Sequence, residues 1–282
     1  MELELKNKIL SEIKFSDKDH KIRVEIANNF IQKLQKTADE NKIKVEFFIG
    51  GSFGKNTYLK DSSDIDTFAR FDKNYDDEKI SEMLKEILEK TNIEFKKQKG
   101  SRDYYSVEFV EKNQNFLFEF VPNRKISSPE SFVNTTDISP FHVEYLHKKG
   151  KENPEIYDEI RLAKRFFKSK KLYGAESYIG GFAGHVIDIL IMHYKSLENL
   201  IKSAKDWKET TFIDINSAYK DEKDAIKKMD SAKISKLILV DSILLDRNAA
   251  RALSDENYYK FLDVVNSINE LSENDFKIKN KI

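Results

Sequence analysis

Apolar residues recur every three or four positions along the first forty residues, with charged residues between them. This spacing places the apolar side chains on one face of a helix and predicts helical structure over residues 1–40. Ser16-Asp17 predicts a helix cap between two segments of that stretch. A second stretch with helical spacing covers residues 76–91.

Strand patterns alternate with these helices in the first half of the chain. Residues 45–49 are mostly β-branched or aromatic and run into two glycines, which predicts a strand that ends in a tight turn. Pro122 should end the last of the strands, because proline lacks the amide donor of a ladder. The further strands are expected at residues 64–72, 104–110 and 116–121.

From about residue 126 the pattern becomes mainly helical. We therefore expect an α+β protein, with a mixed sheet and helices in residues 1–125 and a mainly helical domain in residues 126–282. The helices of the second domain are expected at residues 142–149, 154–170, 178–204 and 249–271, with a short strand at 237–240.

Composition limits the chemistry. The chain has 282 residues with 49 basic and 49 acidic side chains, so a protein that coats nucleic acid through its overall charge is disfavoured, whereas a local basic channel is not. There is no cysteine and the five histidines are dispersed, so a catalytic metal should be a hard ion held by oxygen. The N-terminal sequence has no continuous apolar run, so we expect no signal peptide and no membrane span there. This favours a cytoplasmic location.

One group of motifs in the first half of the chain indicates a catalytic site. Gly50-Gly51-Ser52 follows the first strand, and a loop then leads to Asp64-Ile65-Asp66. Residues two apart in a strand share a face, so Asp64 and Asp66 would present two carboxylates to one point. Such a pair is costly without a cation, and two Mg²⁺ ions would satisfy it. The glycines would let backbone N–H groups approach a triphosphate.

Each half of this group of motifs has an ordinary structural explanation. Asp-x-Asp alone is usually a solvated loop or a cap, and Gly-Gly-Ser alone is usually a turn. Their combination in the order strand, turn, loop, strand is much more specific. The combination therefore favours metal-dependent nucleotidyl transfer.

Residues 50–72 resemble the signature of the archaeal, class I CCA-adding enzymes, which are tRNA nucleotidyltransferases of the polymerase β-like superfamily. The resemblance continues in the family's order from about residue 45 to residue 255. Its further motifs are Phe118-Glu119-Phe120-Val121-Pro122, Thr136-Asp137-Ile138-Ser139-Pro140-Phe141-His142, Glu159-Ile160-Arg161-Leu162-Ala163-Lys164, Tyr173-Gly174-Ala175-Glu176, Gly181-Phe182-Ala183-Gly184 and Asp246-Arg247-Asn248-Ala249-Ala250-Arg251-Ala252-Leu253-Ser254.

The resemblance implies a role for particular residues. Asp64, Asp66 and Glu119 would be the catalytic carboxylates and the metal ligands. Arg247 would lie near the base or the primer phosphate. The implied nucleotide-binding residues are Gly51, Ser52, Lys55, Ser139, His142, Lys164, Tyr173 and Arg247.

Two positions differ from the family in residue type. Glu119 stands where the family usually has aspartate, and Glu108 on the neighbouring strand is a rival for the third carboxylate. Lys55 stands where the family usually has arginine, which keeps the charge but loses the bidentate fork.

Several of these residues also have ordinary explanations. Lys164 lies in a lysine-rich helix that by composition is usually a solvated face, and Tyr173 could cover a helix end. Arg247 could belong to a helix cap, and His185 in an apolar helix is more often packed than catalytic. Residues 96–102 are a candidate phosphate-contacting loop or simply a solvated hairpin.

The expected function is addition of C and A from CTP and ATP to the 3′ end of tRNA or a similar RNA, with two Mg²⁺ ions and release of pyrophosphate. Two alternatives remain open: an oligonucleotide synthetase or nucleotidyltransferase toxin or resistance enzyme, and a catalytically weak RNA-binding subunit. The family's body and tail domains, which grip tRNA, would begin about where this sequence stops. Their absence leaves open a homodimer or a partner subunit that replaces them.

Overall fold

The computed structural model describes residues 1–62, 64–100, 102–229 and 234–278. Its contacts divide the chain into two units. The sheet unit comprises Phe15–Glu144, and the helical unit comprises Met1–Lys14 together with Tyr145–Ile282. The division falls later than the expected boundary at residue 125, and the first helix groups with the C-terminal part of the chain. Ser63 and Ser101, which lie within the segments singled out above, are outside the described residues.

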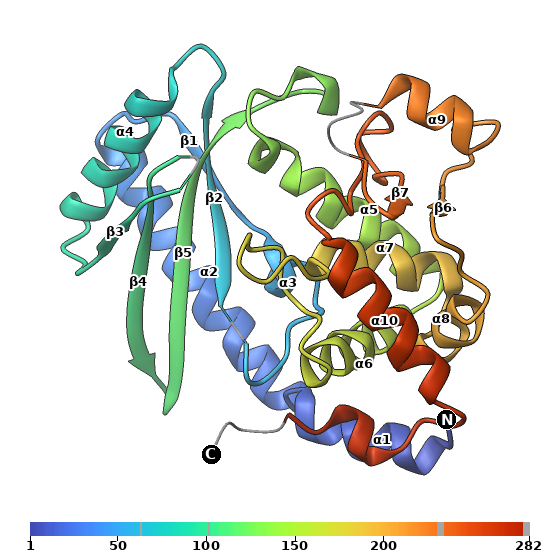
Figure 1. The fold of residues 1–282 in the computed structure, drawn as a ribbon. Helices are drawn as coiled ribbons and strands as arrows, with labels where there is room; N and C mark the ends of the chain where they lie inside the picture. The colour runs from blue at the N-terminus through green and yellow to red at the C-terminus, as the bar shows by residue number, and fades with distance from the viewer. Residues whose placement is uncertain (63, 101, 230–233, 279–282) are drawn as a thin grey trace. The chain divides into compact units, whose positions relative to one another are not determined.

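A mixed sheet in the order β1-β2-β5-β4-β3 forms the centre of the sheet unit. β2 and β5 run parallel, and the other neighbouring pairs are antiparallel. Helices α2 and α4 cover one face of this sheet (Figure 1). The elements are α2 (Asp17–Glu40), β1 (Val45–Ile49), α3 (Gly51–Gly54), β2 (Ile65–Asp72), α4 (Asp77–Lys90), β3 (Lys96–Gln98), β4 (Tyr104–Glu111), β5 (Gln114–Lys125), η1 (Pro129–Ser131), η2 (Thr135–Ile138) and the start of α5 (Ser139–Glu152).

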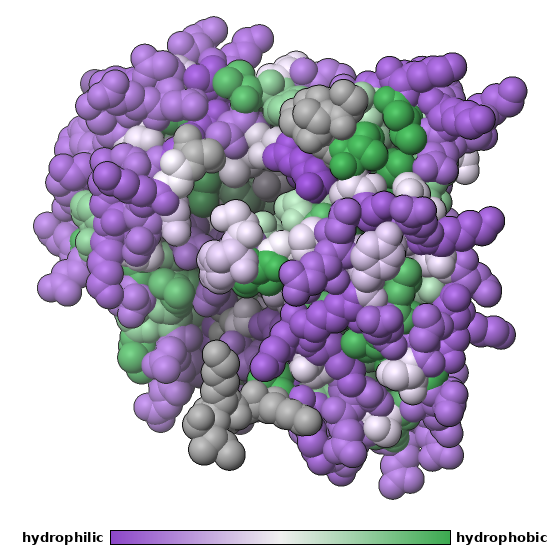
Figure 2. Space-filling model, viewed as in Figure 1, coloured by the Kyte–Doolittle hydropathy of each residue, from purple (hydrophilic) through white to green (hydrophobic). Residues whose placement is uncertain are grey.

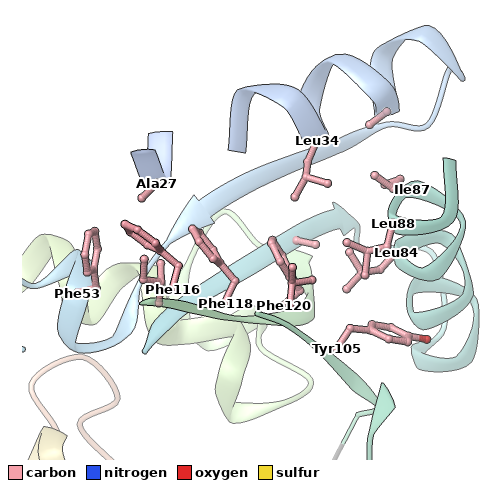
Figure 3. Close-up of a cluster of buried hydrophobic side chains, with 14 of the residues drawn as sticks. Ala27, Leu34, Phe53, Leu84, Ile87, Leu88, Tyr105, Phe116, Phe118 and Phe120 are labelled. Atoms are coloured by element: carbon pink, nitrogen blue, oxygen red, sulfur yellow. The ribbon is translucent and has the colours of Figure 1, made fainter. Parts of the chain in front are cut away.

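The core of the sheet unit depends on a row of phenylalanines. Phe116, Phe118 and Phe120 occupy alternate positions of β5 and are buried, because successive residues of a strand point to opposite faces. Their rings lie in sequence along the strand, with centroids 6.4 and 5.8 Å apart. Apolar side chains of α2 and α4 surround the row (Figure 3). This face of the sheet is therefore closed by packing, and the opposite face is left for polar residues.

Pro122 does not end the strand, contrary to the expectation from its missing donor. β5 continues to Lys125, with Pro122 opposite Ala69 of β2. The carbonyl of Pro122 accepts a hydrogen bond from Arg102 Nη1 at 3.3 Å. In a strand, the amide nitrogen and the carbonyl of one residue point to the same side, so the nitrogen of Pro122 also points to the side of Arg102. This is the side of β4, and the ladder between β4 and β5 has already ended at Phe120. The missing N–H therefore costs no ladder hydrogen bond.

Helices dominate the helical unit, as expected. A small parallel pair of strands, β6 and β7, accompanies them. None of the helices in the described ranges combines the length and the apolar character that crossing a membrane requires. The elements are α1 (Leu3–Ile13), the end of α5, α6 (Ile156–Ser169), α7 (Gly184–Tyr194), α8 (Leu197–Ala204), β6 (Thr211–Ile213), α9 (Glu222–Lys228), β7 (Leu237–Leu239), α10 (Asp255–Ser267) and η4 (Glu273–Phe276).

The prediction of a single helix over residues 178–204 is wrong. Lys195 adopts a left-handed conformation with φ 73° and ends α7. Ser196 then accepts a hydrogen bond from the Asn199 amide and caps α8. The apolar pattern continues through this break because both helices bury their apolar side chains in the same unit. The helix expected over 249–271 is likewise shorter, since Ser254 caps α10 and the residues before it form turns.

Phe118→Ala tests the phenylalanine row. Phe118 is fully buried and its ring contacts those of Phe30, Phe109, Phe116 and Phe120, so truncation should lower the free energy of unfolding by about 3–5 kcal/mol. The measurement is urea-induced unfolding followed by circular dichroism. Val110→Ala on the same hairpin, where Val110 is 70% exposed, is the matched control and should change stability by less than about 0.5 kcal/mol. Equal effects of the two variants would contradict the packing described here.

Candidate active site

Two acidic residues face each other across the parallel strands of the sheet. The register of β2 against β5 places Asp66 opposite Glu119. Their neighbours Ile65 and Phe118 point into the core, so the two carboxylates belong to the other face of the sheet. Asp64 immediately precedes β2 and is exposed. Adjacent strands lie about 4.8 Å apart, so this register brings Asp66 and Glu119 together at one point of the sheet.

The raised pKa of Glu119 is consistent with the proximity of the other two acidic groups. Partial burial raises the pKa of its carboxyl above the ordinary value of 4.5, and the charges of Asp66 and then Asp64 raise it further. The three acidic groups therefore lie close enough to repel one another. Such a cluster is stable in its charged form only with a cation between its members. An all-oxygen donor set at a point of negative charge fits a hard divalent metal ion.

The rival carboxylate, Glu108, is elsewhere. It pairs with Leu117 of β5, and its exposed side chain lies 3.3 Å from Lys96 Nζ. The position opposite Glu119 on β4 is Ser106 instead. The geometry thus favours Glu119 as the third carboxylate.

The glycine turn is built around Asp66. The Gly50 amide donates to the Asp66 carbonyl at 2.8 Å, which ties the end of β1 to β2. Gly51 has φ +55°, and a Cβ at that position would lie 1.6 Å from Asp66 Oδ2. A Cβ at Gly54 would lie 2.4 Å from the carbonyl oxygen of Ile49. Glycine is required at both positions, because any side chain would displace the carboxylate or the backbone.

Ser52 and Lys55 belong to this same turn. Ser52 is half-buried within α3, and Lys55, the residue that follows α3, is largely buried. The turn brings both residues close in sequence to Gly51 and hence to the carboxylate that Gly51 contacts. The structure therefore brings Gly51 against the Asp66 carboxylate, with Ser52 as the next residue of the turn.

Sequence reasoning missed a buried ion pair in the sheet unit. Arg102 makes two hydrogen bonds to Asp137, and both side chains are almost fully buried. Burial alone would raise the pKa of Asp137, but hydrogen bonds from Arg102 and from the amides of Arg124 and Asn134 lower it below its ordinary value. Asp137 also closes a capping box with Asn134 at the start of η2. The spacing of Asn134 and Asp137 was the signal that could have identified this cap.

This pair explains two of the sequence motifs. Within residues 96–102, Arg102 is a structural anchor, and Lys97 forms an ion pair with Asp103 at 2.6 Å. In the motif at 136–142, Asp137 holds the segment from which α5 begins. Ser139 is the first residue of α5 and His142 lies in its first turn. These two predicted residues are therefore placed by a buried salt bridge in the sheet unit.

Tyr104 is another residue that sequence reasoning missed. Burial raises its pKa, and the charge of Glu119 raises it further, which places the phenol near the carboxylates. Tyr104 and Ser106 are alternate residues of β4, so they share the face that carries Glu119. The only sequence signal for Tyr104 was the two-residue alternation along its strand.

In the helical unit, Lys164 and Tyr173 meet at the start of α7. A Cβ at Gly184 would lie 2.9 Å from Tyr173 Oη and 3.9 Å from Lys164 Cε. Lys164 is buried, and its Nζ lies 3.2 Å from Asp188 Oδ1 one turn further along α7. The lysine is thus part of the interior, and the expectation of a merely solvated face does not apply to it.

Arg247 is held next to the same helix. Asp241 is fully buried and accepts hydrogen bonds from Arg247 Nη1 and, at 3.2 Å, from His185 Nε2. His185 follows Gly184 directly, so the two groups of residues are adjacent at the start of α7. The structure brings together Lys164, Tyr173 and Arg247 within one unit, although they come from three separate motifs.

The fold and the site define a class of protein. Residues 28–133 match the family described as "Nucleotidyltransferase domain", and residues 158–277 match "tRNA nucleotidyltransferase, second domain". Among solved structures, a cytoplasmic RNA terminal U-transferase has a TM-score of 0.69 at 13% identity and covers 96% of this chain and 94% of its own. The structure titled E. coli MS115-1 CdnC with ATP has a TM-score of 0.69 at 15% identity, with 94% and 89% covered. The fold is that of a polymerase β-like nucleotidyltransferase followed by a helical domain.

By sequence, the chain is similar to the archaeal CCA-adding enzymes over most of its length. The CCA-adding enzyme of Nanoarchaeum equitans is 38% identical over 87% of this chain and 64% of its own length. That of Methanocaldococcus jannaschii is 34% identical over 92% of this chain and 58% of its own length. The chain therefore spans roughly three fifths of the curated relatives that it matches. A nucleotidyltransferase domain implies a nucleoside triphosphate and a divalent metal ion, which the carboxylate cluster fits.

Glu119→Gln should stabilise the metal-free protein near neutral pH. Because the folded state raises the pKa of Glu119, wild-type stability falls as pH rises from about 4.5 through that raised value, and the amide removes this loss. In a chelating buffer the melting temperature of the variant should exceed that of wild type at pH 7, and the two should converge below pH 4.5. Added Mg²⁺ should raise the melting temperature of wild type more than that of the variant. A lower melting temperature of the variant at pH 7 would contradict the repulsion.

Gly51→Ala should weaken divalent metal binding. The added Cβ overlaps Asp66 Oδ2, and alanine in a left-handed conformation costs about 1–2 kcal/mol. Isothermal titration with Mn²⁺ should show an affinity lower by about tenfold or more, since displaced metal ligands typically cost that much. Unchanged Mn²⁺ affinity would show that the glycine does not shape the carboxylate site.

Proposed function

We propose that this chain is an RNA 3′-terminal nucleotidyltransferase that adds C and A residues from CTP and ATP to tRNA or tRNA-like ends and releases pyrophosphate. The observation that carries the proposal is the opposition of Asp66 and Glu119 across β2 and β5, directly beside the Gly51 turn. Sequence similarity to CCA-adding enzymes over most of the chain supports the choice of acceptor.

In this proposal Asp64, Asp66 and Glu119 hold the metal ions, which are Mg²⁺. When bound, a pair of Mg²⁺ ions makes the 3′ hydroxyl more acidic and neutralises charge on the leaving pyrophosphate. The carboxylates of Asp66 and Glu119 orient the primer hydroxyl toward the α-phosphate. The register of β5 against β2, which sets the Cα of Glu119 opposite that of Asp66, supports a shared role for the two carboxylates.

Each unit contains residues to which the proposal assigns contacts with triphosphate oxygens. Ser52 Oγ and the backbone N–H groups of the Gly51 turn donate to its oxygens, and Lys55 contributes positive charge. In the helical unit, the Lys164 ammonium and the Tyr173 hydroxyl bind phosphate oxygens, and Asp188 keeps the ammonium in position. The remaining roles assigned in this proposal are phosphate or sugar contacts by Ser139 and His142 and contacts to the base or primer phosphate by Arg247.

The decisive experiment measures nucleotide incorporation. The protein is incubated with Mg²⁺, each labelled nucleoside triphosphate in turn, and tRNA that lacks its 3′-terminal C-C-A. Ordered addition of C, C and A is expected, and Asp66→Asn should lower the rate by at least about a hundredfold, since it removes a direct metal ligand. Asp72→Asn, at the exposed end of the same strand, is the matched control and should retain wild-type activity.

Other outcomes would change the conclusion. Products that form without added RNA would point to an oligonucleotide synthetase. Incorporation that is unaffected by Asp66→Asn would show that the carboxylate cluster is not the catalytic centre.

A further inference from the structure

Two arginines flank one turn of the helical unit: Arg247 precedes the turn and Arg251 ends it. The segment after β7 folds back so that Val240 forms a bridge with Asn248, and the Asn248 carbonyl accepts a hydrogen bond from the Arg251 amide at 3.3 Å. The Asn248 side chain fixes this turn through hydrogen bonds from the Leu239 and Ala250 amides, both at 3.0 Å. Arg247 and Arg251 are therefore displayed by a well-ordered turn.

Asp241, the carboxylate that pairs with Arg247, has no acceptor position left for a second arginine. Asp241 Oδ1 accepts from the amides of Ile243 and Leu244, and Oδ2 accepts from Arg247 and His185. A carboxylate has about four acceptor positions, and these bonds fill them.

Within the ranges that the structure describes, Arg251 is the member of the pair without an acidic partner. Its side chain is exposed and makes no hydrogen bond or ion pair with any residue in the described ranges. Burial of part of the group lowers its pKa, and the charge of Arg247 lowers it further, so the two guanidinium groups lie close together. Two neighbouring cations with one saturated carboxylate are stabilised by an anion from outside.

An exposed aromatic residue, Tyr178, lies on a loop that is hydrogen-bonded to the residues after this turn. Tyr178 is 85% exposed, on the loop between Tyr173 and Phe182. That loop is tied to the end of the arginine turn, because the Ser254 amide donates to the Gly180 carbonyl at 2.9 Å and Asn257 Nδ2 donates to the Ile179 carbonyl at 2.7 Å. The loop is thus held in place while its tyrosine contributes almost nothing to the core.

We propose that Arg251, Arg247 and Tyr178 form a surface that binds the single-stranded 3′ end of the RNA acceptor, with the arginines on phosphates and Tyr178 stacked on a base. Cationic side chains beside an exposed aromatic ring are the means by which proteins bind single-stranded nucleic acid. Hydrophilic residues cover most of the face seen in Figure 2, and the chain has no net charge. Two neighbouring arginines, one of them without an acidic partner among the described residues, beside an exposed aromatic ring therefore distinguish this surface better than polarity does. The inference rests on the proposed RNA acceptor and adds residues that the motif roles did not include.

The test measures RNA binding separately from catalysis. A fluorescent acceptor minihelix with a single-stranded 3′ tail is titrated with the full chain in a chelating buffer without nucleotides, and anisotropy is recorded over a range of salt concentrations. Arg251→Gln should weaken binding about tenfold and lower the slope of log affinity against log salt by about 0.7, the value for one phosphate of a single strand. Tyr178→Ala should weaken binding about five- to a hundredfold, and Tyr178→Phe should retain it.

Two matched controls lie in the same unit. Lys202→Gln on α8 removes an exposed charge, and Tyr259→Ala on α10 removes a less exposed ring; neither should change RNA affinity. If Arg251→Gln and Tyr178→Ala bind RNA like these controls while the protein still adds C and A, this surface is wrong and the transferase function stands. If Arg251→Gln weakens CTP or ATP binding and leaves RNA binding unchanged, the surface belongs to the nucleotide and the inference fails. RNA binding that responds as expected in a protein without transferase activity would support the surface alone.

Discussion

The repulsion between Asp66 and Glu119 is the constraint around which the sheet unit is arranged. Parallel pairing of β2 with β5 forces the two side chains onto one face at the same level, and the glycine turn then closes over Asp66. Because neighbouring like charges are unfavourable without a cation, this arrangement of carboxylates fits a divalent metal ion. Packing of the opposite face around Phe118 supplies the rigidity that keeps the carboxylates in place.

Some other buried charged side chains in the protein have a partner of opposite charge. Arg102 and Asp137 neutralise each other, and Lys164 lies beside Asp188. Such pairs position segments of the chain, since removal of one partner would leave a buried charge uncompensated. The acidic cluster around Glu119 has charges of one sign instead. Buried pairs of opposite charge compensate each other within the protein, whereas a cluster of one sign fits a cation from outside.

The helical unit shows how one helix end can collect residues from distant motifs. Gly184 makes room for Tyr173 and Lys164, and its neighbour His185 contacts the carboxylate that orients Arg247. Each of these residues had an ordinary explanation when considered alone. Their convergence on the start of α7 is a property of packing that the separate motifs do not contain.

Local patterns in the sequence determined most of the helices and strands, the cap at Ser16 and the glycines of the turn, because periodicity, capping and φ angles are properties of neighbouring residues. They did not determine the break at Lys195, since the apolar pattern runs through it. Nor did they determine the buried Arg102–Asp137 pair, the position of Tyr104 or the choice of Glu119 over Glu108. Those were decided by strand register and by burial, which depend on contacts between residues far apart in the chain.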